Sequence, residues 1–317
     1  MASTQDKIYG IKELYRPADG SSEFDIVAVH GLNGDACRTW TARVKKVCWL
    51  NDAEFLPKYV RNARVLTWGY NASFSSLTGD RPSKDRIHQH AHTLVANLAA
   101  DRQLAGTADQ PIIFLCHSLG GIVVKRALSY AQTRTGHKLS REFSIFTCTY
   151  GILFFGTPHH GSSKASWLAY LKKAGSIITP TSRGMKKSDL VSALEQESET
   201  LQNITDYFVP LMRHFRIYFF WEQEPTDLGL FGKDLIVTQD SAAPRHDDTE
   251  RAGIAANHSG MVKFEDPSSP GFLMVVDALL RYCASAPDAI RLRRAEAVEA
   301  LDRERRREAA EAVAACW

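Results

Sequence analysis

The sequence lacks several features that define whole classes of protein. It contains no run of about eighteen apolar residues, so no membrane-spanning helix is expected. Residues 1–14 carry charges of both signs and no apolar core, which argues against a secretory signal. Their acidic residues also argue against a mitochondrial presequence. We therefore expect an intracellular protein, cytoplasmic or peripheral to an organelle membrane, that is not secreted.

Metal binding and nucleic-acid binding have little support in the composition. The 6 cysteines show no paired spacing typical of a metal site. Cys116 and Cys148 fall in or beside presumptive core strands, where we interpret them as reduced, small apolar residues. The 39 Lys and Arg residues nearly balance the 36 Asp and Glu residues, and both signs are interspersed along the chain. We expect no metal, no cofactor and no nucleic-acid partner.

What is present is one sizeable core of α/β type. With 317 residues, of which 44% are hydrophobic, the chain is long enough for a single α/β domain. Strand-type and helix-type segments alternate from Asp25 to about Gly156. This alternation predicts a mostly parallel central sheet with helices on both faces.

Composition divides the chain into three parts. Residues 1–23 form a polar lead-in, and residues 24–286 form the α/β domain, with an insertion at about 162–210. Residues 287–317 form a charged tail rich in Ala, Glu and Arg, for which helix is the natural state. Its apolar stripe is thin, so we expect an exposed or loosely docked helix, and one open role for it is binding a protein partner.

The segment around Ser118 predicts a nucleophile. An apolar strand-type run at 112–117 ends at Ser118, and a helix-type apolar run follows. A serine on such a sharp strand-to-helix turn exposes its Oγ at the carboxyl edge of the sheet, and the N–H of Leu119 then faces the same space as an oxyanion donor. Cys116 stands where the usual pattern has glycine, and a serine that merely caps the helix is the alternative interpretation.

A second oxyanion donor is predicted after an early strand. The run at 24–30 has the character of a buried strand, and the sequence Gly-Leu-Asn-Gly follows it at 31–34. Glycines there let the backbone turn inward with its amides free, so the N–H of Leu32 is the candidate donor. A plain turn at the strand exit is the alternative. We interpret His30 as structural, packed beside the nucleophile turn.

The general base should come late in the chain, and His258 fits. It lies in a polar loop between a strand expected at 235–238 and an apolar helix expected at about 272–282. His246 lies nearby in a charged loop and is its main competitor. We favour His258 for its position and for its small neighbours.

The acid that orients this histidine should lie between Ser118 and His258 along the chain. The strand expected at 215–221 is followed directly by Glu222, which is our choice. Asp234 is the best rival because it precedes the strand expected at 235–238. Three further acids are within reach of the same region: Glu224, Asp227 and Asp240.

Five segments carry a resemblance to a known family. They are His30-Gly31-Leu32-Asn33-Gly34, Thr67-Trp68-Gly69-Tyr70, His117-Ser118-Leu119-Gly120-Gly121, Phe154-Phe155-Gly156-Thr157-Pro158-His159-His160-Gly161 and Asn257-His258-Ser259. Together they resemble the lipase-like serine esterases of the α/β-hydrolase superfamily. Within it they are similar to the serine-active-site-containing proteins linked to phosphatidylglycerol remodelling, and to their fungal relatives. The resemblance covers about residues 25–282 and implies an α/β-hydrolase fold. It also supports Glu222, because the acid of that group commonly follows the corresponding strand.

The resemblance implies a lid or pocket built from the insertion at about 162–210. Trp167, Leu168 and Leu171 have the spacing of one apolar helix face, which either covers the site or packs on the domain. We expect the substrate pocket to include His30, His117, Trp167 and Leu171. Lysine pairs at 172–173 and 186–187 are candidates for contact with anionic head groups, although short basic pairs are usually solvated.

These observations predict a serine hydrolase that cleaves or transfers the acyl group of a carboxylic ester, lipid-like by resemblance. Its partners would be that ester, with phospholipid as a candidate, and a membrane surface contacted peripherally. Two alternatives stay open. One is a hydrolase that tailors a small secondary-metabolite ester or lactone, and the other is a catalytically weak signalling or binding module.

Overall fold

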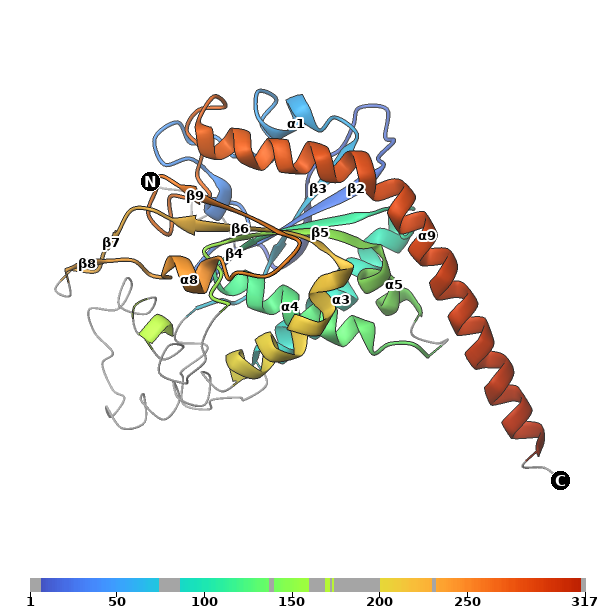
Figure 1. The fold of residues 1–317 in the computed structure, drawn as a ribbon. Coiled ribbons are helices and arrows are strands. Elements are labelled where there is room, and N and C mark those ends of the chain that lie inside the picture. Colours follow the sequence, from blue (N-terminus) through green and yellow to red (C-terminus); the bar gives the residue numbers. More distant parts are fainter. Residues whose placement is uncertain are drawn as a thin grey trace.

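The computed structural model describes residues 7–73, 86–136, 140–159, 169–171, 173, 200–229 and 232–314. Seven strands form one central sheet in the order β1-β3-β2-β4-β5-β6-β9 (Figure 1). They are β1 (Gly10–Tyr15), β2 (Phe24–Val29), β3 (Ala63–Gly69), β4 (Ile112–His117), β5 (Thr149–Phe155), β6 (Arg216–Glu222) and β9 (Thr249–Ile254). β1 is antiparallel to β3, and the remaining neighbours are all parallel. The carboxyl ends of six strands therefore meet at one edge.

The central strands are apolar because helices cover both faces of the sheet. Every residue of β2, β3 and β4 is buried. Parallel strands covered in this way show continuous apolar runs rather than alternation. This is why the segments at 24–30 and 112–117 were recognisable from the sequence.

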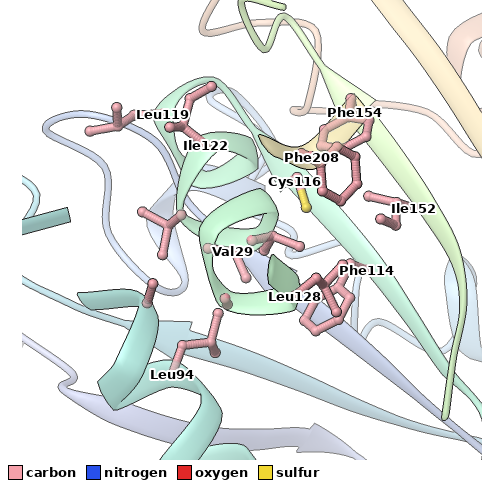
Figure 2. Close-up of a cluster of buried hydrophobic side chains, with 14 of the residues drawn as sticks. Val29, Leu94, Phe114, Cys116, Leu119, Ile122, Leu128, Ile152, Phe154 and Phe208 are labelled. Carbon is pink, nitrogen blue, oxygen red and sulfur yellow. The ribbon is translucent and has the colours of Figure 1, made fainter. Parts of the chain in front are cut away.

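One face of the sheet is covered by α3 (Arg86–Leu104), α4 (Leu119–Gln132) and α5 (Ser140–Cys148), together with a helical segment at 200–208. Figure 2 shows the core under α4, where Leu128 faces Phe114 of the sheet, with Cys116 and Phe154 nearby. The opposite face is covered by the first half of α9 (Pro270–Ala314) together with the short α1 (Leu56–Tyr59) (Figure 1). Each buried large apolar side chain contributes about 1.5–3 kcal/mol to folding.

The amino edge of the sheet contains a buried cluster of charges. Asp25, at the start of β2, accepts a hydrogen bond from Arg64 Nε (2.8 Å) through Oδ1 and one from Arg102 Nη1 through Oδ2. Arg64 also donates to Thr107 Oγ1 (3.0 Å), and Arg102 donates to the Gln110 carbonyl (2.7 Å). The carboxylate and both guanidinium groups are at most 1% exposed.

The prediction of a strand at 235–238 is wrong. Those residues form an irregular segment between β8 (Lys233–Asp234), which pairs with β7 (Thr226–Asp227), and α8 (Gln239–Ala242). The last strand of the sheet is β9, which the sequence did not suggest. Ile236 and Val237 are apolar because they are buried in the hydrophobic core, whereas β9 is a half-exposed edge strand with polar residues.

The helix expected at about 272–282 and the charged tail form one helix, α9, so residue 287 marks no break in it. Pro287 lies inside this helix. The helix stays docked beyond it through Ile290, which is 1% exposed, and through Arg293, which donates to the Thr149 carbonyl (2.6 Å). The end of α9 projects away from the rest of the fold (Figure 1). Across the described ranges, no helix is both long and apolar enough to cross a membrane.

The strand order, the single antiparallel edge strand and the helix that starts directly after Ser118 define the α/β-hydrolase fold predicted from the sequence. Ser118 follows the central strand β4, so its side chain emerges at the carboxyl edge. That edge is where parallel α/β sheets bind ligands.

Candidate active site

Ser118 occupies a strained turn between β4 and α4. Its backbone has φ 53° and ψ −125°, a conformation rarely adopted by a residue with a side chain. The helix leaves the turn so close to the end of the neighbouring strand β2 that a Cβ on Gly120 would lie 2.5 Å from the Val29 and His30 carbonyl oxygens. Thr157 Oγ1 supports the turn by donating to the Ser118 carbonyl (3.0 Å). Cys116 is fully buried in β4, so it fits where the usual pattern has glycine.

Ser118, His258 and Glu222 form one chain of hydrogen bonds. His258 Nε2 lies 2.9 Å from Ser118 Oγ, and His258 Nδ1 is hydrogen-bonded to Glu222 Oε2. All three residues are buried. The carboxylate accepts a hydrogen bond from Nδ1 when the imidazole proton is on that nitrogen. Nε2 is then unprotonated and can accept the Ser118 hydroxyl proton. The structure thus brings together three residues that are widely separated in the sequence.

Glu222 is the last residue of β6 rather than the first residue after it. Its second oxygen, Oε1, accepts the backbone N–H of Ile236 (2.6 Å) and of Val237 (3.4 Å). The irregular segment that replaces the strand expected at 235–238 therefore holds the carboxylate. Its two amides and the imidazole fix both oxygens of this buried group.

His258 lies in a tight turn that begins after β9. The Gly260 and Met261 amides both donate to Asn257, at 3.0 Å each. The His258 ring packs against Gly156, where a Cβ would lie 3.0 Å away. His117 Nε2–H donates to the His258 carbonyl (2.9 Å), so His117 positions this loop. Burial, followed by the proximity of His258, lowers the pKa of His117 well below its usual value and keeps it neutral.

The rival acids and the rival histidine do not take part in this hydrogen-bond chain. Asp234 is exposed on β8, where it pairs with Lys173 (2.7 Å). His246 lies in the loop between α8 and β9, and the histidine hydrogen-bonded to Ser118 is His258. The three remaining rival acids are all exposed: Glu224, Asp227 and Asp240.

Two backbone amides adjoin the Ser118 side chain. Leu119 is the first residue of α4, so its N–H has no acceptor within the helix. The loop that contains Leu32 passes so close to Ser118 that a Cβ on Gly31 would lie 2.6 Å from the Ser118 Cβ. Hydrogen bonds from Asn33 N to the Ala72 carbonyl (2.7 Å) and from Gly34 N to the Gly31 carbonyl fix this loop. Within the described residues, the Leu32 N–H makes no backbone hydrogen bond.

His30 packs beside the nucleophile turn. Its ring stacks on Tyr70, and its backbone carbonyl accepts the Tyr70 hydroxyl (3.0 Å). Burial lowers the pKa of His30 to about 4, so the ring is neutral at physiological pH. His30 and His117 both line the cavity that contains Ser118, whose volume is about 1410 Å³.

The insertion contributes a residue that sequence reasoning missed. The Tyr170 hydroxyl lies 2.9 Å from Ser118 Oγ, and burial raises the pKa of Tyr170 to about 12, so it keeps its proton. No pattern in the sequence distinguishes Tyr170 from the other apolar residues around it. Leu171, expected to line the pocket, packs in the hydrophobic core instead, because this helical turn is buried against the domain. Trp167, Leu168 and most of the insertion lie outside the described residues.

The described part of the chain offers no group of three or more His, Cys, Asp or Glu residues that could hold a metal ion. The arrangement has what acyl transfer requires: a nucleophile, a base, an acid that orients the base, and amides beside the reacting atom.

Comparison with known proteins gives relatives for most of the chain. No family model matches. Protein SERAC1 of Homo sapiens is 27% identical over 256 residues, which are 75% of this chain and 36% of that protein. Protein SERAC1 of Danio rerio is 28% identical over 236 residues, which are 69% of this chain and 33% of that protein. The chain therefore spans about a third of the length of these curated relatives. The predicted resemblance to the serine-active-site-containing group is confirmed.

Solved structures of esterases and lipases are also similar. Mature lipase BlEst2 of Bacillus licheniformis is 20% identical, covers 85% of this chain and 97% of its own, and has a TM-score of 0.49. A carboxyl esterase from Bacillus coagulans is 10% identical, covers 88% of this chain and 100% of its own, and has a TM-score of 0.47. With TM-scores below 0.5, the fold assignment rests on the strand order and on the position of Ser118.

Proposed function

We propose that this chain is a serine hydrolase that cleaves, or transfers, the acyl group of a carboxylic ester. The observation that carries the proposal is the hydrogen-bond chain from Ser118 Oγ through His258 to Glu222, in which Ser118 and His258 line an open cavity. A serine hydroxyl becomes a strong nucleophile when a base oriented by a third group removes its proton.

The reaction has two stages. His258 Nε2 takes the Ser118 proton as Oγ attacks the acyl carbon, and the amides of Leu32 and Leu119 stabilise the oxyanion. The bond from acyl carbon to alcohol oxygen then breaks, and His258 returns the proton to the leaving alcohol. In the second stage His258 deprotonates a water, which attacks the acyl-enzyme and releases a carboxylic acid and free Ser118. Glu222 stabilises the imidazolium in both stages.

Tyr170 supplies a neutral donor at the nucleophile. Because the Ser118 proton is directed at His258, the Tyr170 hydroxyl is the donor in its hydrogen bond to Oγ. As Oγ becomes an ester oxygen it accepts hydrogen bonds less well, while negative charge grows on the neighbouring carbonyl oxygen. We propose that Tyr170 then donates to that oxyanion, in addition to the two amides.

A lipid-like acyl group is the substrate we propose. The cavity of about 1410 Å³ exceeds the roughly 300–1,000 Å³ of most small-molecule pockets and has room for a long acyl chain. The resemblance to proteins linked to phosphatidylglycerol remodelling favours the same class. If a lipid alcohol replaces water in the second stage, the same residues perform transacylation. We further propose that Trp167 contacts the acyl chain and that the insertion contacts the membrane peripherally.

We also propose an intracellular location and a partner-binding role for the end of α9. The five described cysteines are free, as expected in a reducing compartment. The last turns of α9 are exposed and rich in ion pairs within the helix, such as Arg307 with Glu311.

Hydrolysis of p-nitrophenyl butyrate and of a long-chain p-nitrophenyl ester tests the function. Ser118→Ala should abolish both activities. The control Ser144→Ala should keep them, because Ser144 lies in α5 and does not line the cavity. Thermal unfolding of each variant checks that the fold is intact. Wild-type protein that cleaves neither ester, or Ser118→Ala that keeps its activity, would contradict the proposal. Cleavage of the short ester alone would indicate that the substrate is a small soluble ester.

A further inference from the structure

Nearly all of the charged side chains that line the cavity at Ser118 are positive. Its lining includes six cationic side chains, namely Lys7, Lys12, Arg38, Arg43, Lys46 and Lys263. Among the described lining residues, Asp35 is the single carboxylate, and its Oδ1 already accepts the amides of Cys37 (3.0 Å) and Arg38 (2.9 Å). The whole chain carries a net charge of only +3, so the cavity is far more basic than the protein around it.

These six cations make no ion pair with any carboxylate in the part of the chain that the structure describes. Cationic side chains just outside the cavity do have carboxylate partners, as Lys45 has in Asp266 (3.5 Å). The unpaired charges come from three separate parts of the chain, residues 7–12, 38–46 and 263, that converge at the carboxyl edge. Lys7 reaches this edge because β1 is antiparallel, with Gly10 opposite Gly69 at the end of β3.

Lys263 is held in place with one donor to spare. Its Nζ donates to the Arg38 carbonyl and to the Thr41 carbonyl (3.4 Å), and an ammonium group has three N–H donors. The side chain is half-buried. Burial, followed by the charges of Arg43 and Arg38, lowers the pKa of Lys263 to about 8. Cations crowded in this way would all gain from one shared anion.

Arg43 connects this cluster to the base. Its Nη2 donates to Ser259 Oγ, and Ser259 directly follows His258. A guanidinium has five N–H donors in a planar fork, so most of those on Arg43 stay available to a ligand. Because Ser118 and His258 line the same cavity, an anion bound here would share that cavity with the ester that Ser118 attacks.

We propose that Arg43, Lys263 and Arg38 form an anion subsite that holds a phosphate or carboxylate group of the substrate next to its scissile ester. The inference rests on the proposed function and narrows its substrate to esters that carry a negative charge. The subsite binds the anion by charge-assisted hydrogen bonds, and the more distant Lys7, Lys12 and Lys46 attract it into the cavity.

Binding and turnover test the subsite separately. In the binding arm, calorimetry with butyl phosphate and with butyrate measures affinity in the wild type, Arg43→Ala, Lys263→Met and the control Lys45→Ala. At least one of the two anions should bind the wild type, and affinity should fall about tenfold or more in Arg43→Ala and Lys263→Met. Lys45→Ala should match the wild type. Absence of binding to both probes, or equal binding in all four proteins, would overturn the subsite even if Ser118 is catalytic.

In the turnover arm, the ratio of kcat/KM for p-nitrophenyl hemisuccinate to that for p-nitrophenyl butyrate is measured in the same four proteins. The ratio should be well above one in the wild type and Lys45→Ala and should fall about tenfold in the other two. A ratio that does not change contradicts the inference and leaves the hydrolase intact, whereas no turnover of either ester contradicts the hydrolase. Vesicles of phosphatidylcholine with and without an anionic phospholipid then distinguish a lipid head group from a soluble anion, because only the former makes hydrolysis depend on the vesicle surface.

Discussion

Cationic side chains at the two edges of the central sheet differ in whether they have carboxylate partners. At the amino edge, Arg64 and Arg102 are fully buried and share the two oxygens of Asp25. At the carboxyl edge, Arg43 and Lys263 line an open cavity without a carboxylate partner in the described residues. The cations at the amino edge are thus neutralised by carboxylates of the protein, whereas Arg43 and Lys263 at the carboxyl edge are not neutralised by any described carboxylate.

The difference follows from what each edge has to do. Burying an unpaired charge costs several kcal/mol, so a charge that serves only the fold must bring its counter-ion with it. A charge that serves a ligand must leave its counter-ion out, because an internal partner would compete with that ligand. The amino edge therefore contributes to stability, and the carboxyl edge keeps its charges for substrate.

The largest expected effect is on the chemistry at the carboxyl edge. His258→Ala removes the base that is 2.9 Å from Ser118 Oγ, and kcat should fall by about 10⁴-fold. The free energy of unfolding of His258→Ala should change much less than the activation free energy of the reaction. His246→Ala serves as the control and should be nearly neutral. Steady-state kinetics with a p-nitrophenyl ester measures both, and a reversed order of the two effects would assign the base to His246.

The second effect separates the two edges by stability. Asp25→Asn leaves the buried Arg102 without a carboxylate partner in the described residues, and it leaves Arg64 with only Asp101 and Glu13. It should lower the free energy of unfolding by about 3–5 kcal/mol. Arg43→Ala removes an exposed cation that has no carboxylate partner in the described residues and should change it by no more than about 0.5 kcal/mol. Urea unfolding measures both values. Similar losses in the two variants would show that the edges do not differ.

A third and smaller effect concerns Tyr170. Tyr170→Phe keeps the ring and removes the hydroxyl that lies 2.9 Å from Ser118 Oγ. We expect kcat to fall by about tenfold with little change in KM, as for the loss of one donor that acts mainly in the transition state. An increase in kcat would instead mean that Tyr170 obstructs the nucleophile.

Much of the fold could be predicted because its signals are local. β2 and β4 are buried on both faces and show as apolar runs, and Ser118 stands at the abrupt change from strand to helix. Glu222 could be chosen because β6 ends there. Glu222 was preferred to Asp234 from the sequence, but only the folded chain shows that Asp234 pairs with Lys173 at the surface.

What could not be predicted depends on contacts between distant segments or on weak patterns. β9 is polar because it is a half-exposed edge strand, so its sequence lacks an apolar run. Tyr170 meets Ser118 only through the tertiary fold. The basic cavity escapes notice because Arg43 and Lys263 are 220 residues apart along a chain whose overall charge is nearly balanced.

The smallest effect is a pH dependence at the carboxyl edge. Burial and the charges of Arg43 and Arg38 lower the pKa of Lys263 to about 8, while Asp35 and Cys48 act weakly in the opposite direction. Lys263 is therefore charged below about pH 8 and loses its charge above it. The preference for an anionic over a neutral ester should fall a few-fold as the pH rises through 8, and Lys263→Met should abolish that fall. A pH-independent preference in the wild type would contradict the role of Lys263.

The most direct test of Ser118 as the nucleophile is to find which residue a fluorophosphonate modifies. The intact protein is treated with the probe, digested and analysed by peptide mass spectrometry. We expect a single phosphonyl adduct, on Ser118, that forms far more slowly in His258→Ala. An adduct on any other residue, or ester hydrolysis by a protein that takes up no adduct, would contradict it.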